Sequence, residues 1–207
     1  MSHPYLKQIN NKETNQTLVS LRMFAEDNKV PIITEVGLNF LIQLIKLRNV
    51  STILEIGTAI GYSSIAMALK TDVTITTIER DIKMYDIAKK NVLNSNLEDR
   101  IDIIYKDALE VDETVLNSVD LIFIDAAKAQ SIKFFEKYEK LLTSKGIIVT
   151  DNLLFHNLVD QEVKDRNLRQ LLTKIDRFNK WVVEKQGYDT YIYEIGDGMS
   201  VSIKRSD

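Results

Sequence analysis

The sequence contains no cysteine, two prolines, seven glycines and two histidines among its 207 residues. Without cysteine, the chain can form no disulfide, no thiolate zinc site and no cysteine nucleophile. With His3 and His156 as its only histidines, a histidine-rich metal site is nearly excluded. A Ser-His-Asp triad would need one of these two residues, and the Gly-x-Ser-x-Gly turn that presents such a serine is missing. The sequence therefore argues against cysteine, zinc-thiolate and serine-triad chemistry.

Long apolar runs and linkers are missing as well. The longest apolar runs are far too short to span a bilayer, and the N-terminus has no signal-peptide layout, so we expect a cytoplasmic protein without a membrane partner. No repeat, low-complexity tract or Gly/Pro-rich linker divides the chain, which predicts a single domain over residues 1–207. The net charge of −3 argues against a strongly basic nucleic-acid binder but leaves room for a local basic patch.

What the chain does contain is an alternation of helix-like and strand-like segments. Helical spacing over residues 13–29 and 35–47 predicts a helical N-terminal extension over 1–48, ahead of a core over 50–207. Because strands alternate with helices in that core, we expect right-handed crossovers and a doubly wound, mostly parallel sheet. The predicted strands are Thr52–Ile56, Val73–Ile78, Ile101–Tyr105, Leu121–Ile124 and Ile147–Thr150, and the predicted helices are Tyr62–Leu69, Ile82–Asn94, Ser131–Leu142 and Asn167–Glu184.

The C-terminal segment has a different character. Thr190–Ile195 and Met199–Lys204 flank Gly196-Asp197-Gly198, which predicts a β-hairpin closed by a tight turn. A parallel sheet completed by an antiparallel hairpin is typical of the methyltransferase variant of the Rossmann fold. We therefore predict an α/β protein with a Rossmann-like class I methyltransferase fold and seven strands.

Polar residues follow two of the predicted buried strands. Asp125 and Lys128 follow the run that ends at Ile124, and Asp151 and Asn152 follow the run that ends at Thr150. In one parallel sheet these strand ends meet at the same edge, where open α/β sheets bind ligands. Two carboxylates and an amide oxygen form a hard site suited to Mg²⁺. Either run alone would fit helix capping or a turn equally well, but the two together favour a metal.

The first strand-to-helix turn, Glu55-Ile-Gly57-Thr-Ala-Ile-Gly61, indicates a cofactor loop. Its glycines allow a sharp turn and a close backbone approach to a ligand. A dinucleotide fingerprint would place glycine at position 55, whereas Glu55 would repel a pyrophosphate. The same acid can organise the amino-acid end of a cationic cofactor. A helix-packing role for the two glycines is the alternative.

Two acids follow the next predicted strands in turn. Glu79 lies where a carboxylate can accept hydrogen bonds from both ribose hydroxyls, and Asp107 lies where an adenine edge would be read. Each could instead be a solvated strand-end residue. Their order and spacing fit S-adenosylmethionine (SAM), whose sulfonium, ribose and adenine would be met in succession, and fit nicotinamide cofactors poorly.

These motifs resemble the cation-dependent class I O-methyltransferases, the family of catechol and caffeoyl-CoA O-methyltransferases, over almost the whole chain. The resemblance rests on residues 55–63, 78–79, 106–108, 123–128, 150–152 and 196–198. It implies that Mg²⁺, or another divalent cation such as Mn²⁺ or Ca²⁺, binds Asp125, Asp151 and Asn152, with Lys128 as general base. It further implies that SAM contacts Ile33, Glu55, Gly57, Ser63, Glu79, Asp107 and Asp125.

Within this family the chain is most similar to the bacterial branch that converts 5-hydroxyuridine at the tRNA wobble position to 5-methoxyuridine. The similarity lies in residues 30–33, 54–63 and 195–199. It implies a tRNA anticodon loop as partner, and the alternative is a small catechol-like phenol. The resemblance implies a longer N-terminus and an insertion loop for a CoA thioester in plant members, which we do not expect in this short chain, and this argues against a caffeoyl-CoA substrate. The family also implies a homodimer.

The predicted last long helix carries a basic stripe. Its residues Arg166, Arg169, Thr173, Arg177 and Lys180 share one face, opposite Leu171, Ile175, Phe178 and Val182. The stripe could follow a phosphate backbone, or it could be an ordinary solvated face. A non-catalytic binding module with the same fold is a third interpretation, but it would have no need for the whole Asp125, Lys128, Asp151 and Asn152 set.

Overall fold

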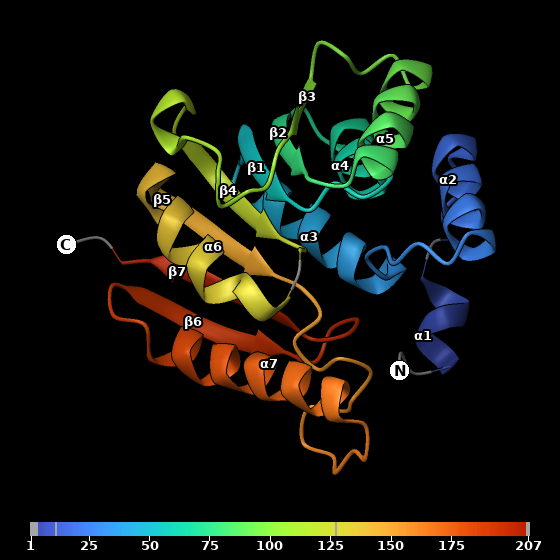
Figure 1. Cartoon of the computed structure of the whole chain (residues 1–207). Helices are drawn as coiled ribbons and strands as arrows, with labels where there is room; N and C mark the ends of the chain where they lie inside the picture. The colour runs from blue at the N-terminus through green and yellow to red at the C-terminus, as the bar shows by residue number, and fades with distance from the viewer. Residues whose placement is uncertain (1–3, 11, 127, 206–207) are drawn as a thin grey trace.

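The structure is a computed structural model that describes residues 4–10, 12–126 and 128–205. Its centre is a seven-stranded sheet in the order β3-β2-β1-β4-β5-β7-β6 (Figure 1). The strands β1 to β5 are parallel, whereas β7 is antiparallel to β5 and β6 is antiparallel to β7. The predicted fold is therefore confirmed. The strands are β1 Thr52–Ile56, β2 Thr74–Glu79, β3 Ile101–Tyr105, β4 Val119–Ile124, β5 Leu142–Thr150, β6 Tyr188–Tyr193 and β7 Met199–Lys204.

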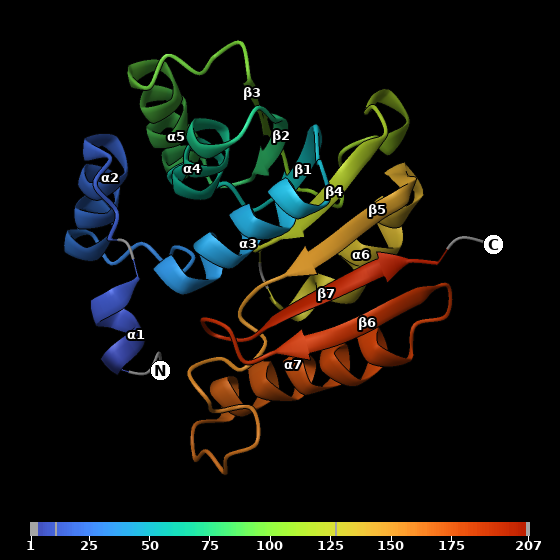
Figure 2. The same cartoon turned by 180° about the vertical axis from the view of Figure 1, so that it is seen from behind.

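Helices cover both faces of this sheet (Figures 1 and 2). The helices α3, α4 and α5 lie on one face, and α6 and α7 lie on the other, so successive residues of a central strand enter different cores. Phe123 of β4 packs in the α3 core, and its neighbour Ile122 packs in the α7 core. The helices are α1 Pro4–Ile9, α2 Gln16–Asp27, α3 Glu35–Leu47, α4 Tyr62–Lys70, α5 Ile82–Asn94, α6 Ser131–Tyr138 and α7 Arg166–Glu184.

Local signals in the sequence explain where several helices begin. Asn15, Thr34, Asp81 and Asp165 are N-caps whose side chains accept hydrogen bonds from backbone N–H groups of α2, α3, α5 and α7. Helix α4 follows Gly61 in a left-handed conformation (φ 82°) and has no side-chain cap. The first N–H groups of α4 thus lack a side-chain cap at the turn predicted to bind the cofactor.

The predicted helix Ser131–Leu142 is too long. The α-helix ends at Tyr138, a 3₁₀ turn follows over Glu139–Leu141, and β5 already begins at Leu142. Leu142 is buried and pairs with Val119 of β4, so the sheet takes a residue that helical spacing alone assigned to the helix. The short helix α1 lies within the predicted helical extension, but outside the two segments whose spacing indicated a helix.

Helix α7 confirms the predicted two-sided pattern with one change. The residues buried against the sheet are Leu172, Ile175, Phe178 and Val182, whereas the predicted Leu171 is half-buried. Trp181 packs edge-on against Phe135, with 5.2 Å between ring centroids. Within the described part of the chain, no helix has the length and apolar character needed to cross a membrane.

Candidate active site

The hydrogen-bond ladder of the sheet continues past the strand ends into the predicted site. The Asp125 N–H donates to the Ile56 carbonyl (2.9 Å), and the Asp151 N–H donates to the Ile124 carbonyl (3.2 Å). Asp125 and Asp151 are thus the first residues beyond β4 and β5, fixed in register at the carboxyl edge of the sheet. This is the edge at which open α/β folds bind ligands.

Two predicted site residues converge on one oxygen atom of a third. Lys128 Nζ lies 3.0 Å from Asp125 Oδ1, and Asn152 Nδ2 donates to the same oxygen over 3.1 Å. The side chains of Lys128 and Asp125 are only 10% and 16% exposed, so this ion pair is largely shielded from solvent. A shielded ion pair is held more firmly than a surface pair, which gives the Lys128 amine a defined place beside the carboxylate.

Asp151 is the most buried member of the set. It is 1% exposed, and no described residue donates a hydrogen bond to its Oδ1. Burial, together with the negative charge of Asp125, raises the pKa of Asp151 far above its usual range, although Lys128 partly opposes the rise. A buried carboxylate beside a second carboxylate is costly unless a cation or a proton compensates it.

This donor set fits a hard divalent cation. Among the described residues, no group of three His, Cys, Asp or Glu side chains is placed to hold a metal. A cation here would therefore depend on two carboxylates, the Asn152 amide oxygen and oxygens from substrate or water. Mg²⁺ usually binds through one or two carboxylates and keeps its remaining positions for water or substrate.

Gly57 brings the cofactor loop against this site. It has a φ of +102°, and a Cβ at this position would lie 2.4 Å from the Asp125 carbonyl oxygen. Any other residue would therefore push apart the ends of β1 and β4. The glycine predicted to allow close approach to a ligand is thus also required where the chain approaches Asp125.

Glu55 is enclosed by hydroxyl groups of its own chain. It is 0% exposed and accepts hydrogen bonds from Ser63 Oγ (2.5 Å), Thr77 Oγ1 (2.6 Å) and Ser64 Oγ. Burial raises the pKa of Glu55 to about 7 despite these three donors. Glu55 is thus hydrogen-bonded directly to Ser63, and because Glu55 has no exposed surface, it would act on a cofactor through Ser63.

Glu79 organises the other side of the cofactor loop. Its Oε2 accepts from the Ala59 N–H over 2.8 Å, and its Oε1 accepts from the N–H groups of Arg80 (2.9 Å) and Asp81 (2.8 Å). The Glu79 side chain is only partly buried. It thus joins β2 to the β1–α4 turn, at the place where the sequence predicts the ribose.

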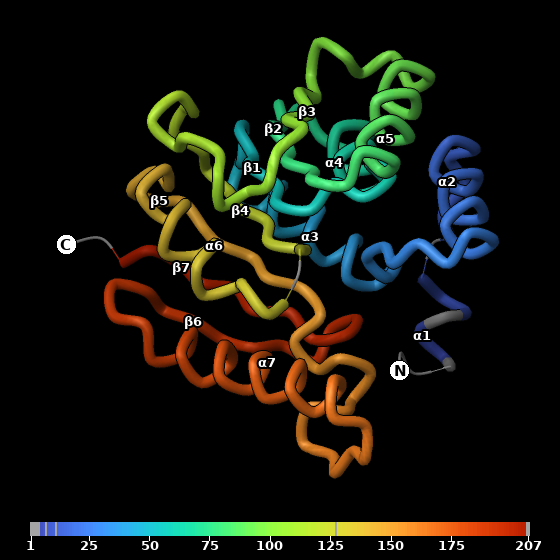
Figure 3. Tube along the Cα trace, viewed as in Figure 1, coloured from blue at the N-terminus to red at the C-terminus, as the bar shows by residue number. Residues whose placement is uncertain are grey.

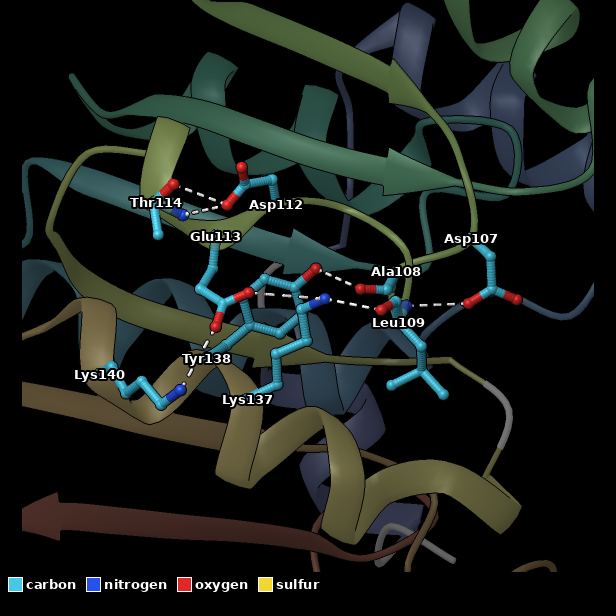
Figure 4. A network of polar contacts seen from close by, with 9 residues as sticks. All are labelled: Asp107, Ala108, Leu109, Asp112, Glu113, Thr114, Lys137, Tyr138 and Lys140. Atoms are coloured by element: carbon cyan, nitrogen blue, oxygen red, sulfur yellow. Dashed lines mark hydrogen bonds and ion pairs between the residues drawn. The ribbon is translucent and has the colours of Figure 1, made fainter.

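Asp107 lies in a segment that α6 holds in place (Figure 4). Asp107 Oδ1 accepts from the Leu109 N–H over 2.9 Å. Tyr138 OH donates to the Ala108 carbonyl (2.5 Å), and Lys137 Nζ donates to the Leu109 carbonyl (2.7 Å). Two consecutive residues of α6 therefore fix two consecutive carbonyls directly after Asp107.

Ile33 comes from an earlier part of the chain than the other predicted site residues. It lies in the connection before α3, is 3% exposed, and has its Cγ1 3.2 Å from the position that a Cβ on Gly37 would take.

Asp197 was not predicted as a site residue, although its negative charge also raises the pKa of Asp151. The Gly196-Asp197-Gly198 motif predicted a turn and contributed to the family resemblance, but it gave no role to Asp197, because the chain segment that this turn meets is distant in sequence.

The comparisons with known proteins agree with this geometry. A family model described as O-methyltransferase matches residues 3–205. The caffeoyl-CoA O-methyltransferase of Populus kitakamiensis is 34% identical over 172 residues, which cover 78% of this chain and 73% of that protein. The chain therefore belongs to the O-methyltransferase family of caffeoyl-CoA type, and it is a SAM-dependent O-methyltransferase.

Two solved structures are similar along nearly the whole chain. A candidate caffeoyl-CoA O-methyltransferase from Staphylococcus aureus has a TM-score of 0.88 and 43% identity, covering 97% of this chain and 96% of that one. An O-methyltransferase from Bacillus cereus, solved in complex with S-adenosylhomocysteine (SAH), has a TM-score of 0.82 and 25% identity, with the same coverage. Relatives with this fold thus bind the SAM product.

Proposed function

We propose that this chain transfers the methyl group of SAM to one of two adjacent oxygens of its acceptor, with a divalent cation held by Asp125, Asp151 and Asn152. The observation that carries the proposal is the convergence of Lys128 and Asn152 on Asp125, next to the buried Asp151 oxygen that receives no hydrogen bond from a described residue. An ordinary strand-end cap would satisfy its carboxylate with backbone N–H groups.

The residues of this chain have separable tasks in that reaction. When bound, the divalent cation supplies Lewis-acid stabilisation of negative charge on the acceptor oxygens. Lys128, whose Nζ lies 3.0 Å from Asp125, takes the proton of the acceptor hydroxyl as its free amine. The acceptor oxygen then bonds to the methyl carbon while the carbon–sulfur bond of SAM breaks, its electron pair goes to sulfur, and SAH leaves. Asp125 and Asp151 fix the acceptor side in place, so the two reactants meet in a defined orientation.

The cofactor side holds SAM through the residues named from the sequence. Glu79 accepts hydrogen bonds from the ribose hydroxyls, Asp107 lies near the adenine, and Ser63, supported by Glu55, lies near the amino-acid end. Gly57, Asp125 and Ile33 complete the proposed contacts. Three backbone N–H groups fix the partly buried Glu79 carboxylate at this turn, where the ribose is proposed to bind.

A small catechol-like phenol is the acceptor that the comparisons favour. The similar Populus protein is named for a caffeoyl substrate, which carries two neighbouring hydroxyl groups. Two such oxygens can chelate a single cation, which explains why an all-oxygen donor set with free positions suits this substrate. A phenol with one hydroxyl could not chelate in this way.

A second candidate acceptor is 5-hydroxyuridine at the tRNA wobble position, which offers a 5-hydroxyl beside a 4-carbonyl. One observation favours it: Arg166, Arg169 and Arg177 are exposed along α7. The fourth cation of the predicted stripe, Lys180, is paired with Asp176 over 2.7 Å. Exposed arginines on one helix face can contact the phosphate backbone of an anticodon stem.

One pair of assays decides between these acceptors. Nucleosides from total tRNA of a strain lacking this gene are compared by mass spectrometry with those of its parent. In parallel, the purified protein is given SAM, Mg²⁺ and either catechol or phenol. Methylation of catechol but not phenol, with unchanged tRNA nucleosides, supports the small acceptor. Loss of 5-methoxyuridine with accumulation of 5-hydroxyuridine supports tRNA, and inactivity in both assays contradicts the proposal.

We also propose that the chain forms a homodimer. Large apolar side chains are exposed on β6 and β7, where Tyr191 is 66%, Tyr193 38% and Ile203 39% exposed. Figure 2 shows no helix over this end of the sheet on the α3 face. Exposed apolar area of this kind is common at protein interfaces. Sedimentation at micromolar concentration should give about twice the chain mass, and a monomer would contradict the proposal.

A further inference from the structure

The loop after β5 has an unusual backbone. Asn152 has a φ of 62°, and Phe155, His156 and Asn157 follow with φ values of 45°, 58° and 59°. The left-handed region is disfavoured for residues with a Cβ, and an L-residue chain rarely keeps three such residues in succession. A bulky side chain such as that of Phe155 is the least suited to it. Contacts from outside the loop must therefore hold this conformation.

The tip of the β6–β7 hairpin provides those contacts. The Leu153 N–H donates to the Gly198 carbonyl (2.9 Å), and the Leu154 N–H donates to the Asp197 carbonyl (2.8 Å). The His156 N–H donates to the Asp197 carboxylate Oδ1 over 2.6 Å. Figures 1 and 3 show the hairpin tip beside the loop that leaves β5. Asp197 thus holds the loop through both its main chain and its side chain.

The tip packs closely against both the loop and the start of α3. A Cβ on Gly198 would lie 2.9 Å from the Leu154 nitrogen, and a Cβ on Gly196 would lie 2.5 Å from Thr34 Oγ1. Thr34 is the N-cap of α3 and follows Ile33, the predicted cofactor contact. The tip therefore fits between the start of α3 and the loop of Asn152.

The Asp197 side chain lies close enough to the proposed metal site for its charge to matter. It is 12% exposed, and its charge acts on Asp151. Its Oδ2 receives no hydrogen bond from any described residue and lies 3.6 Å from His156 Nδ1. A third acid beside Asp125 and Asp151 adds repulsion, so it is a costly choice for a turn that Asn could also form.

We propose that Asp197 is a positioning residue for the metal site: its carboxylate fixes the His156 N–H, and the strained turn so held sets the backbone of Asn152. The inference rests on the proposed metal-dependent function, because a fixed Asn152 matters only if its amide is a ligand. Residues that orient metal ligands are often worth tenfold or more in metal affinity. Asp197 acts through the loop and is not itself placed on the metal.

The test compares D197A and D197N with D189A as a matched control. Asp189 is an exposed acid of the same hairpin, paired with Arg205 at its other end. Two readouts are used: hydrogen exchange of residues 153–158 in the metal-free protein, and Mn²⁺ affinity from the loss of the free-ion electron paramagnetic resonance signal. SAM affinity and the melting temperature are measured on the same samples.

We expect D197A to speed exchange at His156 and to weaken Mn²⁺ binding about tenfold or more, with SAM affinity within about twofold of wild type. D197N keeps an acceptor oxygen and should restore most of both properties, and D189A should change neither. If D197A does not fold, D197S takes its place, because its shorter side chain also loses the contact with His156.

Unchanged exchange, or unchanged Mn²⁺ affinity in a folded D197A protein, would overturn the proposal. It would also fail if D197N were as weak as D197A, because the charge and not the hydrogen bond would then matter. Wild-type protein that binds no Mn²⁺ would contradict the proposed function and with it the metal-positioning role. Hydrogen exchange would still show whether Asp197 holds the loop.

Discussion

The two halves of the carboxyl edge of the sheet differ in how fully their carboxylate oxygens are hydrogen-bonded by the chain. On the cofactor side, formed by the ends of β1, β2 and β3, Glu55, Glu79 and Asp107 all accept hydrogen bonds from the chain itself. On the acceptor side, formed by the ends of β4 and β5 and the hairpin tip, Asp151 and Asp197 each keep a buried oxygen without a hydrogen bond from any described residue.

The backbone follows the same division. The cofactor loop contains one non-glycine residue in the left-handed region, Ala59, whereas the loop after β5 contains four. Strain of this kind costs about 1–3 kcal/mol for each residue and persists where the surroundings enforce it. We infer that the cofactor side is organised by the chain alone, whereas the acceptor side contains carboxylate repulsion that a bound cation would relieve and a strained loop that the hairpin tip holds.

The largest expected effect is on the acceptor side. Asp151→Ala should lower turnover with Mg²⁺ by about a thousandfold or more, because it removes a proposed ligand worth several kcal/mol of charge stabilisation. SAM affinity, measured by calorimetry, should stay within about twofold of wild type. If Asp151→Ala weakened SAM binding as strongly as it lowered turnover, the cofactor side and the acceptor side would not be separable.

Lys128→Ala tests the proposed general base, a second residue of the acceptor side. Losing a general base should lower turnover by roughly 10² to 10⁴, with SAM affinity largely kept. Lys128→Arg retains the ion pair with Asp125 but supplies no base near neutral pH, so it should also be slow. Steady-state kinetics at saturating SAM measure both variants. Undiminished turnover of the Lys128→Ala enzyme would contradict the role of Lys128 as general base.

On the cofactor side, Glu55 should make stability depend on pH. Its pKa is raised from 4.5 to about 7 in the folded chain, so the protonated form favours folding. This stabilisation is present below pH 4.5 and is lost as the pH rises through about 7. With about 1.4 kcal/mol for each pKa unit, it amounts to on the order of 3 kcal/mol.

Glu55→Gln cannot titrate, so its unfolding free energy should fall less than that of wild type between pH 5 and pH 8. Urea unfolding at several pH values measures the difference. Asp151 titrates in both proteins, and its contribution therefore largely cancels in the comparison. Parallel pH profiles for the two proteins would show that Glu55 stays ionised in the folded chain.

The smallest effect is expected at Tyr138, whose hydroxyl holds the segment that follows Asp107 on the proposed adenine side of the cofactor site. Tyr138→Phe removes the buried hydrogen bond to the Ala108 carbonyl, which is worth about 1 kcal/mol. The KM for SAM should rise about fivefold while kcat at saturating SAM stays within about twofold. Tyr191→Phe, on an exposed strand position, is the control and should change neither. A rise in the KM for SAM together with an equally large fall in kcat would instead indicate a general loss of structure.

The fold was predictable because its strands and helices carry simple periodic signals. The apolar run of β4 and the helical spacing of α5 each point to one element, and the predicted bounds of β1, β3, α5 and β7 match the structure. The end of α6 was not predictable, since Leu142 fits a helix locally and joins β5 only through its partner in β4.

The candidate site was predictable only where function follows strand order. Asp125 and Asp151 each come directly after a strand, so topology alone places them together. The enclosure of Glu55 depends on Thr77 and on its register with β1, and the role proposed for Asp197 depends on a contact with His156, 41 residues away in sequence. Such contacts have no local signal, which explains why they emerged only from the structure.

The most direct test removes divalent cations and measures the activity of the acceptor side and the SAM binding of the cofactor side in one sample. Purified protein is treated with a strong chelator, and acceptor methylation and SAM binding are measured before and after Mg²⁺ is restored. We predict that methylation is lost and returns with Mg²⁺, while SAM affinity changes by less than about threefold throughout. Full methylation in the presence of the chelator would contradict the metal site and the division between the two sides.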